Sequence, residues 1–418
     1  MTKKTDTPAI RFKGFSDTWE QRKLGEVGET YTGLSGKSKD DFGHGSGKFI
    51  TYMNVFSNPV ASPNMTEAIE IDDSQNKVRF GDVLFTTSSE TPDEVGMSSV
   101  WLENAENTYL NSFCFGYRPT AEFNPYYLAY MLRSSSMRKK ITFLAQGISR
   151  YNISKNKMMD IEMPIPSIDE QKQIGEYFAN LDNLITLHQR KFEKLTNVKK
   201  SMLEKMFPQN GSSYPEIRFK GFTDPWEQRK LEDYLTVSAE KNTGNIYGRS
   251  DVLSVSGDYG IVNQIEFQGR SFAGASVSNY GVVQTGDVVY TKSPLNSNPY
   301  GIIKTNKGKP GIVSTLYAVY HPKENAFSDF IQVYFEQHAR MNNYMHPLVN
   351  KGAKNDMKVS AENALKGPVC FPSRIEQESI SAFFSVLDNL ITLHQRKPFL
   401  MKWRTSDANR NQTNRLVL

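Results

Sequence analysis

The sequence predicts an α+β fold: two α/β domains in tandem, separated by long helices that pair as an antiparallel coiled coil. Three observations lead to this prediction. The chain is an internal duplication with a period of about 206 residues. A heptad pattern of apolar residues extends through the middle of the chain. Between the duplicated segments, short strand-like runs alternate with turns rich in glycine and proline.

The duplication is carried by segments at the two ends of each half, while the interiors between them barely match. A duplicated scaffold that holds two divergent domains suggests two related binding tasks on two different targets. A weaker repeat inside the domains matches GDVLFT with GDVVYT. The repeated stretches are IRFKGFSDTWEQRKL (10–24) with IRFKGFTDPWEQRKL (217–231), LDNLITLHQRK at 181–191 and again at 387–397, and the Gly-Asp strands at 81–86 and 286–291.

The stretch 167–207 is predicted to form one long spacer helix. Ser167 and Glu170 make a capping box, in which the serine caps a first-turn amide and the glutamate reaches back to the serine amide. Apolar residues then recur at alternating spacings of four and three, which is the pattern of a coiled-coil seam. At 1.5 Å per residue this helix is about 57 Å long. The predicted seam is Ile174, Phe178, Leu181, Ile185, His188, Phe192 and Leu195, and in the second helix Ile380, Phe384, Leu387, Ile391 and His394.

The second long helix is predicted to be shorter than the first. Pro398 lacks an amide and disfavours helical geometry at Lys397, and the apolar pattern dissolves after it. The far half of the central helix, including Phe192 and Met206, is then expected to be poorly covered. The predicted divisions are a first domain 1–166, the central helix 167–207, a linker 208–216, a second domain 217–372, a truncated distal helix 373–397 and an aberrant disordered tail 398–418.

The domain interiors are predicted to mix short strands with one amphipathic helix each. The glycine-rich stretch 43–47 is predicted to be a loop between strands. The first-domain strands are expected near 49–55, 77–87, 99–101 and 114–118, and the helices near 126–143 and 329–344.

Composition narrows the class of protein. A formal net charge of +5 permits a nucleic-acid partner without arguing for one. The two cysteines, Cys114 and Cys370, occupy non-equivalent positions of the repeat, which favours unpaired thiols in a reducing cytoplasm. No apolar run approaches the length of about 18 residues that a membrane span needs. A cytoplasmic protein without a membrane partner is therefore expected.

The sequence contains no complete motif of a known catalytic or cofactor-binding site. The stretch 42–49 resembles a phosphate-binding loop, but it lacks the first glycine at the required spacing and the hydroxyl residue after Lys48. Asn124-Pro125-Tyr126-Tyr127 lacks the second proline of the amino-methyltransferase motif, so a turn is the better interpretation. The six histidines have no metal-ligand spacing, and no nucleophile motif is present. We expect no metal, no cofactor and no enzymatic activity of the chain by itself.

Two pairs of polar loops are the strongest candidates for a binding surface. In each domain one loop follows the Gly-Asp strand of the repeat, and another precedes the exit from the domain. Arg and Lys contact guanine edges or phosphate, and Asn and Gln contact adenine edges. Ordinary solvated loops are the alternative interpretation. The candidate DNA-binding residues are Thr86, Thr87, Ser88, Gln146, Arg150, Tyr151 and Asn152 in the first domain, and Lys292, Ser293, Asn296, Lys351, Lys354 and Asn355 in the second.

The order of domain, long helix, domain and long helix resembles the specificity subunits of Type I restriction-modification systems. The resemblance rests on Pro-x-Pro-Ser-x-x-Glu-Gln at 164–171, on Leu-Asp-x-x-Ile at 181–185, and on Trp19 followed by Leu-Gly-Glu-Val at 24–27. It covers nearly the whole chain up to Lys397.

The resemblance implies a non-catalytic subunit that reads double-stranded DNA. In that family each domain is a target recognition domain that binds half of a split DNA site, and the antiparallel helices set the gap between the halves. The family also implies two partners: methyltransferase subunits that dock on the helices, and restriction-translocase subunits that join through the complex. Two alternatives remain open: a coiled-coil scaffold whose heads bind protein or glycan, and a decayed, nonfunctional specificity subunit.

Overall fold

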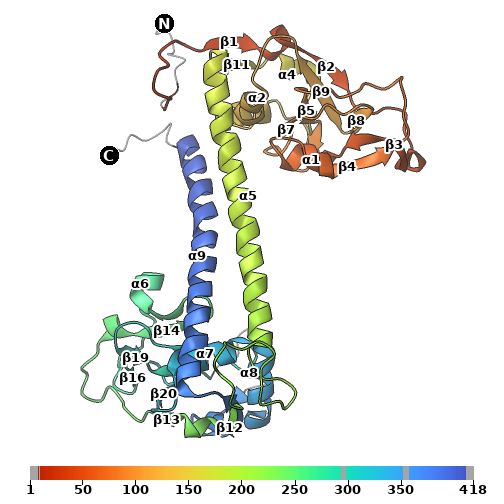
Figure 1. Ribbon diagram of the computed structural model, residues 1–418. Helices are drawn as coiled ribbons and strands as arrows, with labels where there is room; N and C mark the ends of the chain where they lie inside the picture. Colours follow the sequence, from red (N-terminus) through yellow and green to blue (C-terminus); the bar gives the residue numbers. More distant parts are fainter. Residues whose placement is uncertain (1–7, 9, 293–297, 352–356, 411–418) are drawn as a thin grey trace. The chain divides into compact units, whose positions relative to one another are not determined.

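The computed structural model describes residues 8, 10–292, 298–351 and 357–410 (Figure 1). The chain divides into two compact units. The first unit contains residues 1–188 and the segment that begins at Lys397, and the second contains residues 189–396. Helix α5 (Ile168–Lys205) therefore contributes its first half to one unit and its second half to the other.

The first unit is built on a four-stranded antiparallel sheet. Its order is β2-β9-β5-β7, and a second sheet joins β3 to β4 and, in parallel, to β8. The elements are β1 (Glu20–Lys23), β2 (Gly28–Thr32), β3 (Phe42–Ile50), α1 (Tyr52–Ser57), β4 (Thr66–Ile69), β5 (Val83–Thr86), β6 (Ser88–Ser89), β7 (Ser98–Val100), β8 (Thr108–Leu110), β9 (Cys114–Pro119), α2 (Pro125–Met131), α3 (Ser135–Phe143), β10 (Tyr151–Asn152), α4 (Lys155–Met159) and β11 (Glu162–Ile165).

Strand β5 lies at the centre of this core and is buried along its whole length. Successive side chains of a strand point to opposite faces. Val83 and Phe85 accordingly pack with the residues of α2 in one apolar cluster, while Leu84 packs with Trp101 in another. Burial on both faces explains why β5 is a continuous apolar run rather than an alternating one.

The second unit repeats this plan with a different sequence. Its four-stranded sheet has the order β13-β20-β17-β18, again antiparallel throughout, so that β17 corresponds to β5. The elements are β12 (Glu227–Lys230), β13 (Leu235–Val237), β14 (Leu253–Ser256), β15 (Gly260–Asn263), α6 (Gln264–Gln268), β16 (Gly281–Val283), β17 (Val288–Thr291), β18 (Ile303–Thr305), β19 (Gly311–Val313), β20 (Tyr317–Pro322), α7 (Ser328–Glu336), α8 (His338–Met345), β21 (Asn350–Lys351), β22 (Met357–Lys358), β23 (Pro368–Phe371) and α9 (Arg374–Arg410). The predicted α+β class with tandem α/β domains is confirmed.

The duplicated segments meet at the base of each domain. Strand β1 pairs with β11, and β12 pairs with β23, so the entry and the exit of each domain lie together. The carboxylate of Glu170 accepts hydrogen bonds from Nε and from Nη2 of Arg11, each at 2.7 Å. In the second half of the chain, the carboxylate of Glu376 accepts hydrogen bonds from Nε and from Nη2 of Arg218, each at 2.8 Å. Because the entry segment and the start of the following helix bind each other, substitutions in one are constrained by the other, whereas the domain interiors are free of this constraint.

The prediction of a capping box at the start of α5 is confirmed for the serine and wrong for the glutamate. The hydroxyl of Ser167 accepts the amide of Glu170 at 3.4 Å, as predicted. The carboxylate of Glu170 instead binds Arg11 and, at 3.0 Å, the indole nitrogen of Trp19. A guanidinium is a charged, bidentate donor and outcompetes a single backbone amide for a carboxylate.

The glutamine that follows each of these glutamates fixes the domain to its helix. Gln171 accepts the backbone amide of Asn124 at 3.0 Å, directly before α2. Gln377 accepts the amide of Phe327 at 2.9 Å, directly before α7. The Glu-Gln pair of the repeat therefore has two structural tasks: the glutamate holds the entry segment, and the glutamine holds the first helix of the domain.

The single amphipathic helices predicted near 126–143 and 329–344 are each two helices. In the first domain, Ser134 caps α3 by accepting the amide of Met137 at 3.4 Å. Arg133 lies in the break and donates hydrogen bonds to the backbone carbonyls of Val55, Phe56, Asn58 and Ser98. Burial lowers the pKa of Arg133 to about 10. In the second domain the extended backbone of Gln337 separates α7 from α8. The apolar period alone does not reveal such breaks, because both helices keep the same buried face.

The glycine-rich stretch predicted to be a loop is part of strand β3. The pairing of β3 with β4 is irregular between Phe42 and Gly47, which both face Ile69. Gly45 has a positive φ of 95°, and a Cβ at this position would lie 2.5 Å from the carbonyl oxygen of Ile69. Glycine is therefore needed here for a bulged strand, and its presence does not indicate a phosphate-binding loop.

Helix α9 corrects the prediction of a helix truncated at Lys397. It continues through Pro398 as far as Arg410, so the part of the predicted disordered tail up to that residue is helical; residues 411–418 lie outside the described residues. An internal proline removes one backbone hydrogen bond, but a helix can continue beyond it. The residues that follow, Phe-Leu-Met-Lys-Trp-Arg, include good helix formers.

The far half of the central helix was expected to be poorly covered. This expectation is wrong for the C-terminal end of α5. Met206 and Phe207 are buried in the core of the second unit. The rings of Phe207 and Phe384 lie 6.1 Å apart, and Lys199 reaches Asp388, so α5 and α9 run antiparallel within this unit (Figure 1). The first turns of α9, rather than its last ones, therefore cover this end of α5.

A half-buried lysine links the two helices to the second domain. Lys199 Nζ lies 2.6 Å from Glu336 Oε1 on α7 and 2.6 Å from Asp388 Oδ1 on α9. Burial acts to lower the pKa of Lys199, but Glu336 and Asp388 outweigh it, and the pKa is raised above 10.5. The charged lysine therefore stabilises the unit fully below pH 10.5, and this contribution is lost only as the pH rises through the raised value.

Replacement of this lysine is expected to destabilise the second unit. Lys199→Met should lower the free energy of unfolding by about 2 kcal/mol, because it leaves a partly buried carboxylate on α7 without its donor. Urea denaturation of the variant and of Lys194→Met measures this effect. Lys194 is exposed on the same helix and serves as the control. Equal midpoints for both variants would contradict the prediction.

Candidate nucleic-acid interface

The structure brings the two candidate loops of the first domain together. Strand β6 pairs antiparallel with β10, so Ser88 lies opposite Asn152 and Ser89 lies opposite Tyr151. The amide of Ile153 also donates to the carbonyl of Thr87 at 3.0 Å. Side chains more than sixty positions apart in the sequence thus share one surface at the end of β5.

Arg150 is held in place on this surface. Its Nε donates to the hydroxyl of Ser88 at 3.2 Å, and its guanidinium lies 5.7 Å from the centre of the Phe113 ring. The carbonyl of Ser88 accepts the hydroxyl of Tyr52 at 2.7 Å. Burial raises the pKa of Tyr52, which keeps this donor protonated. The arginine remains exposed, so it is an oriented cation that can still meet a ligand.

The loop that carries Arg150 is a closed finger. Gln146 and Asn152 exchange two backbone hydrogen bonds, at 3.0 and 2.8 Å. Gly147 has φ of 145°, and a Cβ there would lie 2.0 Å from the carbonyl oxygen of Arg150. A side chain at this position is therefore excluded by its own loop. The tip of the finger holds Ile148, which is 97% exposed.

Two of the candidate residues lie in the sheet rather than on the surface. Thr86 is completely buried, and its hydroxyl accepts the amide of Met97 at 3.0 Å. Ser88 is 4% exposed and acts by orienting Arg150. The proposal that Thr86 contacts a ligand is therefore corrected, because the residue closes the turn after β5. Thr87, Gln146, Arg150, Tyr151 and Asn152 retain at least partial exposure.

The second domain reproduces the turn that follows β5. Thr291 is buried and accepts the amide of Ile302 at 2.8 Å, as Thr86 accepts that of Met97. Lys292 comes next and is half-buried. Burial, followed by the neighbouring Lys241, lowers the pKa of Lys292. Lys351 belongs to β21, whereas Ser293, Asn296, Lys354 and Asn355 lie outside the described residues.

The predicted seam residues pack partly against the domains. In the first unit Ile174 contacts the core, and Phe178 lies 5.5 Å from the ring of Tyr130 on α2. In the second unit Ile380 and Phe384 are part of the core. The coiled-coil seam remains a proposal for the middle of the helices. The other predicted members are buried (Leu387 and His394) or half-buried (Leu181, Ile185, His188, Phe192, Leu195 and Ile391).

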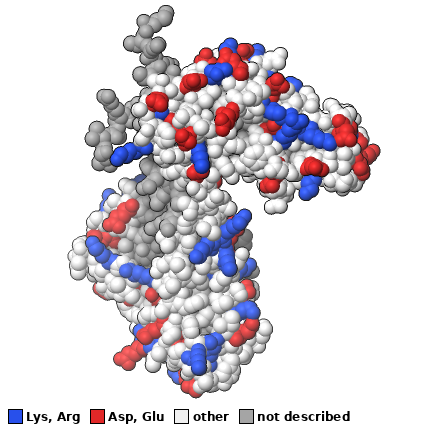
Figure 2. Space-filling view, turned by 45° about the horizontal axis from the view of Figure 1, so that its top comes forward, with Lys and Arg blue, Asp and Glu red and all other residues white. Residues whose placement is uncertain are grey.

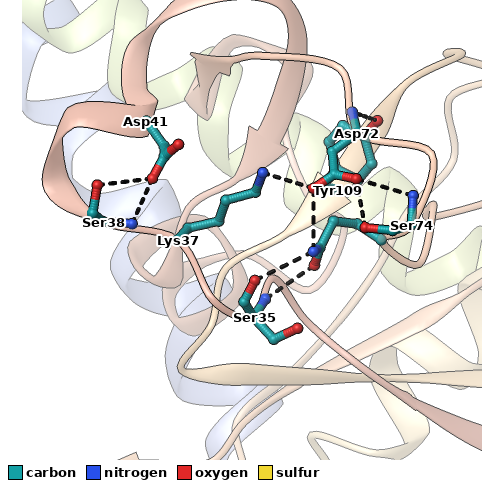
Figure 3. A network of polar contacts seen from close by, with 8 residues as sticks. Ser35, Lys37, Ser38, Asp41, Asp72, Ser74 and Tyr109 are labelled. Carbon is teal, nitrogen blue, oxygen red and sulfur yellow. Dashed lines mark hydrogen bonds and ion pairs between the residues drawn. The ribbon is translucent and has the colours of Figure 1, made fainter.

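A polar network at the outer end of the first domain is structural (Figure 3). Asp72 accepts hydrogen bonds from Lys37 Nζ at 2.7 Å and from the hydroxyl of Ser74 at 2.5 Å. The bond from Lys37, followed by those from Ser74, holds the pKa of Asp72 well below its usual value. The amide of Asp72 donates to Tyr109 Oη at 2.9 Å. These groups satisfy one another, so the network braces two loops and leaves no cation free for a ligand in this cluster.

One face of the molecule carries charges of both signs. On the face shown in Figure 2, basic and acidic side chains alternate and no single sign covers either unit. Among the described residues, no cluster of histidine, cysteine, aspartate and glutamate is placed to hold a metal ion. No helix in the described parts of the chain is long and apolar enough to cross a membrane.

Comparison with known proteins finds similarity to specificity subunits of type I restriction systems. Residues 16–197 match the model of the Type I restriction modification DNA specificity domain. A protein of Methanocaldococcus jannaschii, described as the MjaX specificity subunit of a type I restriction enzyme, is 23% identical over 406 residues, which are 91% of this chain and 89% of the relative. Residues 16–197 thus carry the sequence pattern of a Type I restriction modification DNA specificity domain.

The chain is also similar to two other specificity subunits. The StySPI specificity subunit of Salmonella potsdam is 34% identical over 109 residues, which are 26% of this chain and 23% of the relative. The crystal structure of the S subunit of a Type I system from M. genitalium aligns with a TM-score of 0.57 and 11% identity, over 98% of this chain and all of that one. This structure supports the fold, and the sequence matches support the family.

Proposed function

We propose that this chain is the non-catalytic DNA-recognition subunit of a Type I restriction-modification complex. It reads a bipartite site in double-stranded DNA, one half with each domain, and directs methyltransferase and restriction-translocase subunits to that site. The observation that carries the proposal, beside the family, is the finger of residues 146–152 joined to the end of β5. This surface presents an oriented arginine beside exposed amide side chains.

The chemistry of this surface suits the edges of bases. Arginine binds guanine through its paired acceptors, and asparagine or glutamine pairs with adenine in the major groove. Arg150, Asn152 and Gln146 supply these groups on one finger. The free thiols Cys114 and Cys370 and a DNA partner both favour the cytoplasm as its location.

A binding experiment tests the proposal. The purified chain, alone and with its co-expressed methyltransferase partner, is mixed with a pool of random-sequence duplexes, and bound duplexes are sequenced. We expect one sequence with two conserved halves to be enriched, and affinity to fall with salt because phosphate contacts release counterions. A bound pool without any shared sequence would refute the function.

Arg150→Ala is expected to weaken binding to the selected duplex by roughly 1–3 kcal/mol, because one base contact is lost. The loss should be confined to duplexes that carry the first half-site. Arg79→Ala is the matched control, since Arg79 is exposed near the opposite end of β5. Unchanged affinity for Arg150→Ala would remove the finger from the interface.

A further inference from the structure

In each domain, the loop that leads into the neighbouring strand of the sheet lies beside the turn after the central strand, β5 or β17. Phe113 directly precedes β9, and Leu316 directly precedes β20. The carbonyl of Phe113 accepts the amide of Thr87 at 2.9 Å, and that of Leu316 accepts the amide of Lys292 at 3.1 Å. Both connections therefore lie against the first residue after the central strand.

The geometry of these two connections is the same although the residues differ. The amide of Phe113 donates to the side chain of Asn111 at 2.9 Å, two positions earlier. The amide of Leu316 donates to the side chain of Ser314, also two positions earlier, at 3.4 Å. Side-chain oxygens that bond to the backbone two residues ahead stabilise such turns. Equivalent backbones thus present different apolar side chains.

Both apolar side chains face solvent. Phe113 is 55% exposed and Leu316 is 62% exposed. Single exposed apolar residues are common on protein surfaces. Here, however, the same backbone position is exposed and apolar in both domains, next to a candidate contact residue in each. In the first domain Phe113 also lies under the guanidinium of Arg150.

We propose that Phe113 and Leu316 are specificity-determining residues that each contact the C5-methyl group of a thymine in their half-site. This inference rests on the proposed function. The thymine methyl is the apolar group that base edges offer in the major groove, and apolar side chains recognise it there. Polar neighbours on the same turn contact the polar edges of adjacent bases, so each domain combines an apolar and a polar contact at one place. Exchange of phenylalanine for leucine changes the reach of this contact and hence the position that is read.

The test removes one methyl group at a time. The chain in complex with its methyltransferase partner is titrated with its selected duplex and with duplexes in which single thymines are replaced by deoxyuridine. One buried methyl group is worth about a fourfold change in affinity. We expect the wild-type complex to lose about fourfold at one thymine in each half-site. Phe113→Ala should abolish this difference in the first half-site only, and Leu316→Ala in the second half-site only.

Controls separate this inference from the function on which it rests. Phe80 is 52% exposed and lies at the other end of β5, so Phe80→Ala should keep both differences. Equal affinity of the wild type for thymine and deoxyuridine duplexes would overturn the methyl contact while leaving sequence recognition intact. An equal loss by Phe113→Ala on both duplexes would also overturn it and would indicate a wedge between bases. Failure of the wild type to select any duplex would instead refute the proposed function.

Discussion

Glu376→Ala is expected to lower the free energy of unfolding of the second unit by about 3–5 kcal/mol, because it removes one partner of a buried ion pair. The side chain of Glu376 is 1% exposed and that of Arg218 is 15% exposed. Without the glutamate, the arginine keeps its bond to the carbonyl of Asp224 but has no carboxylate among its described contacts. The entry segment of the domain should then detach from the start of α9.

A second glutamate on the same helix provides the control. Glu378 pairs with Arg374 at 2.8 Å in an exposed position, where both side chains are more than one third accessible. Glu378→Ala should change stability by less than about 0.5 kcal/mol, as exposed pairs do. Thermal and urea denaturation of both variants measures the difference. Comparable losses for the two variants would show that the Arg218 contact is not what closes the domain.

Exchange of the first domain is expected to change one half of the recognised sequence and leave the other half intact. The graft replaces residues 19–166 with the same region of another family member. The physical reason is the closed base, at which β1 pairs with β11 and both ends of the domain meet. Each mismatched base pair costs roughly 1–3 kcal/mol, so the original site should no longer be bound.

Mapping of methylated sites in cells that carry the methyltransferase partner measures this exchange. The reciprocal graft of residues 226–372 serves as the control and should change only the other half-site. A change in both halves, or in neither, would contradict independent reading by the two domains. Loss of all methylation with normal amounts of complex would contradict the modular base.

The sequence predicted the features that depend on local pattern or on internal comparison. The duplication is visible because the segments that touch at each domain base are nearly identical in the two halves. The long helix is visible because its apolar period persists for many turns, and α5 spans Ile168–Lys205 against the predicted 167–207. A proline weakens a helix but does not always end it. For this reason the prediction that the second long helix ends before Pro398 is wrong.

Contacts between distant segments were decided by the tertiary structure. Ser88 and Arg150 meet because two short strands pair, and such short strands have little pattern of their own. Thr86 looked like a surface residue but is buried, since strand register determines which residues face the core. Phe113 and Leu316 were missed because apolar residues beside a strand look like core.

The sequence by itself therefore determined the resemblance to specificity subunits, the two-domain plan and the position of the candidate loops. Which of the candidate residues are exposed was decided only by the fold. Helical periods and repeats arise from neighbours a few positions apart or from matching segments, so they can be recognised along the chain. Exposure of a loop side chain depends on strand pairs and carbonyl partners that lie tens of residues away, and the linear sequence does not show which of these contacts form.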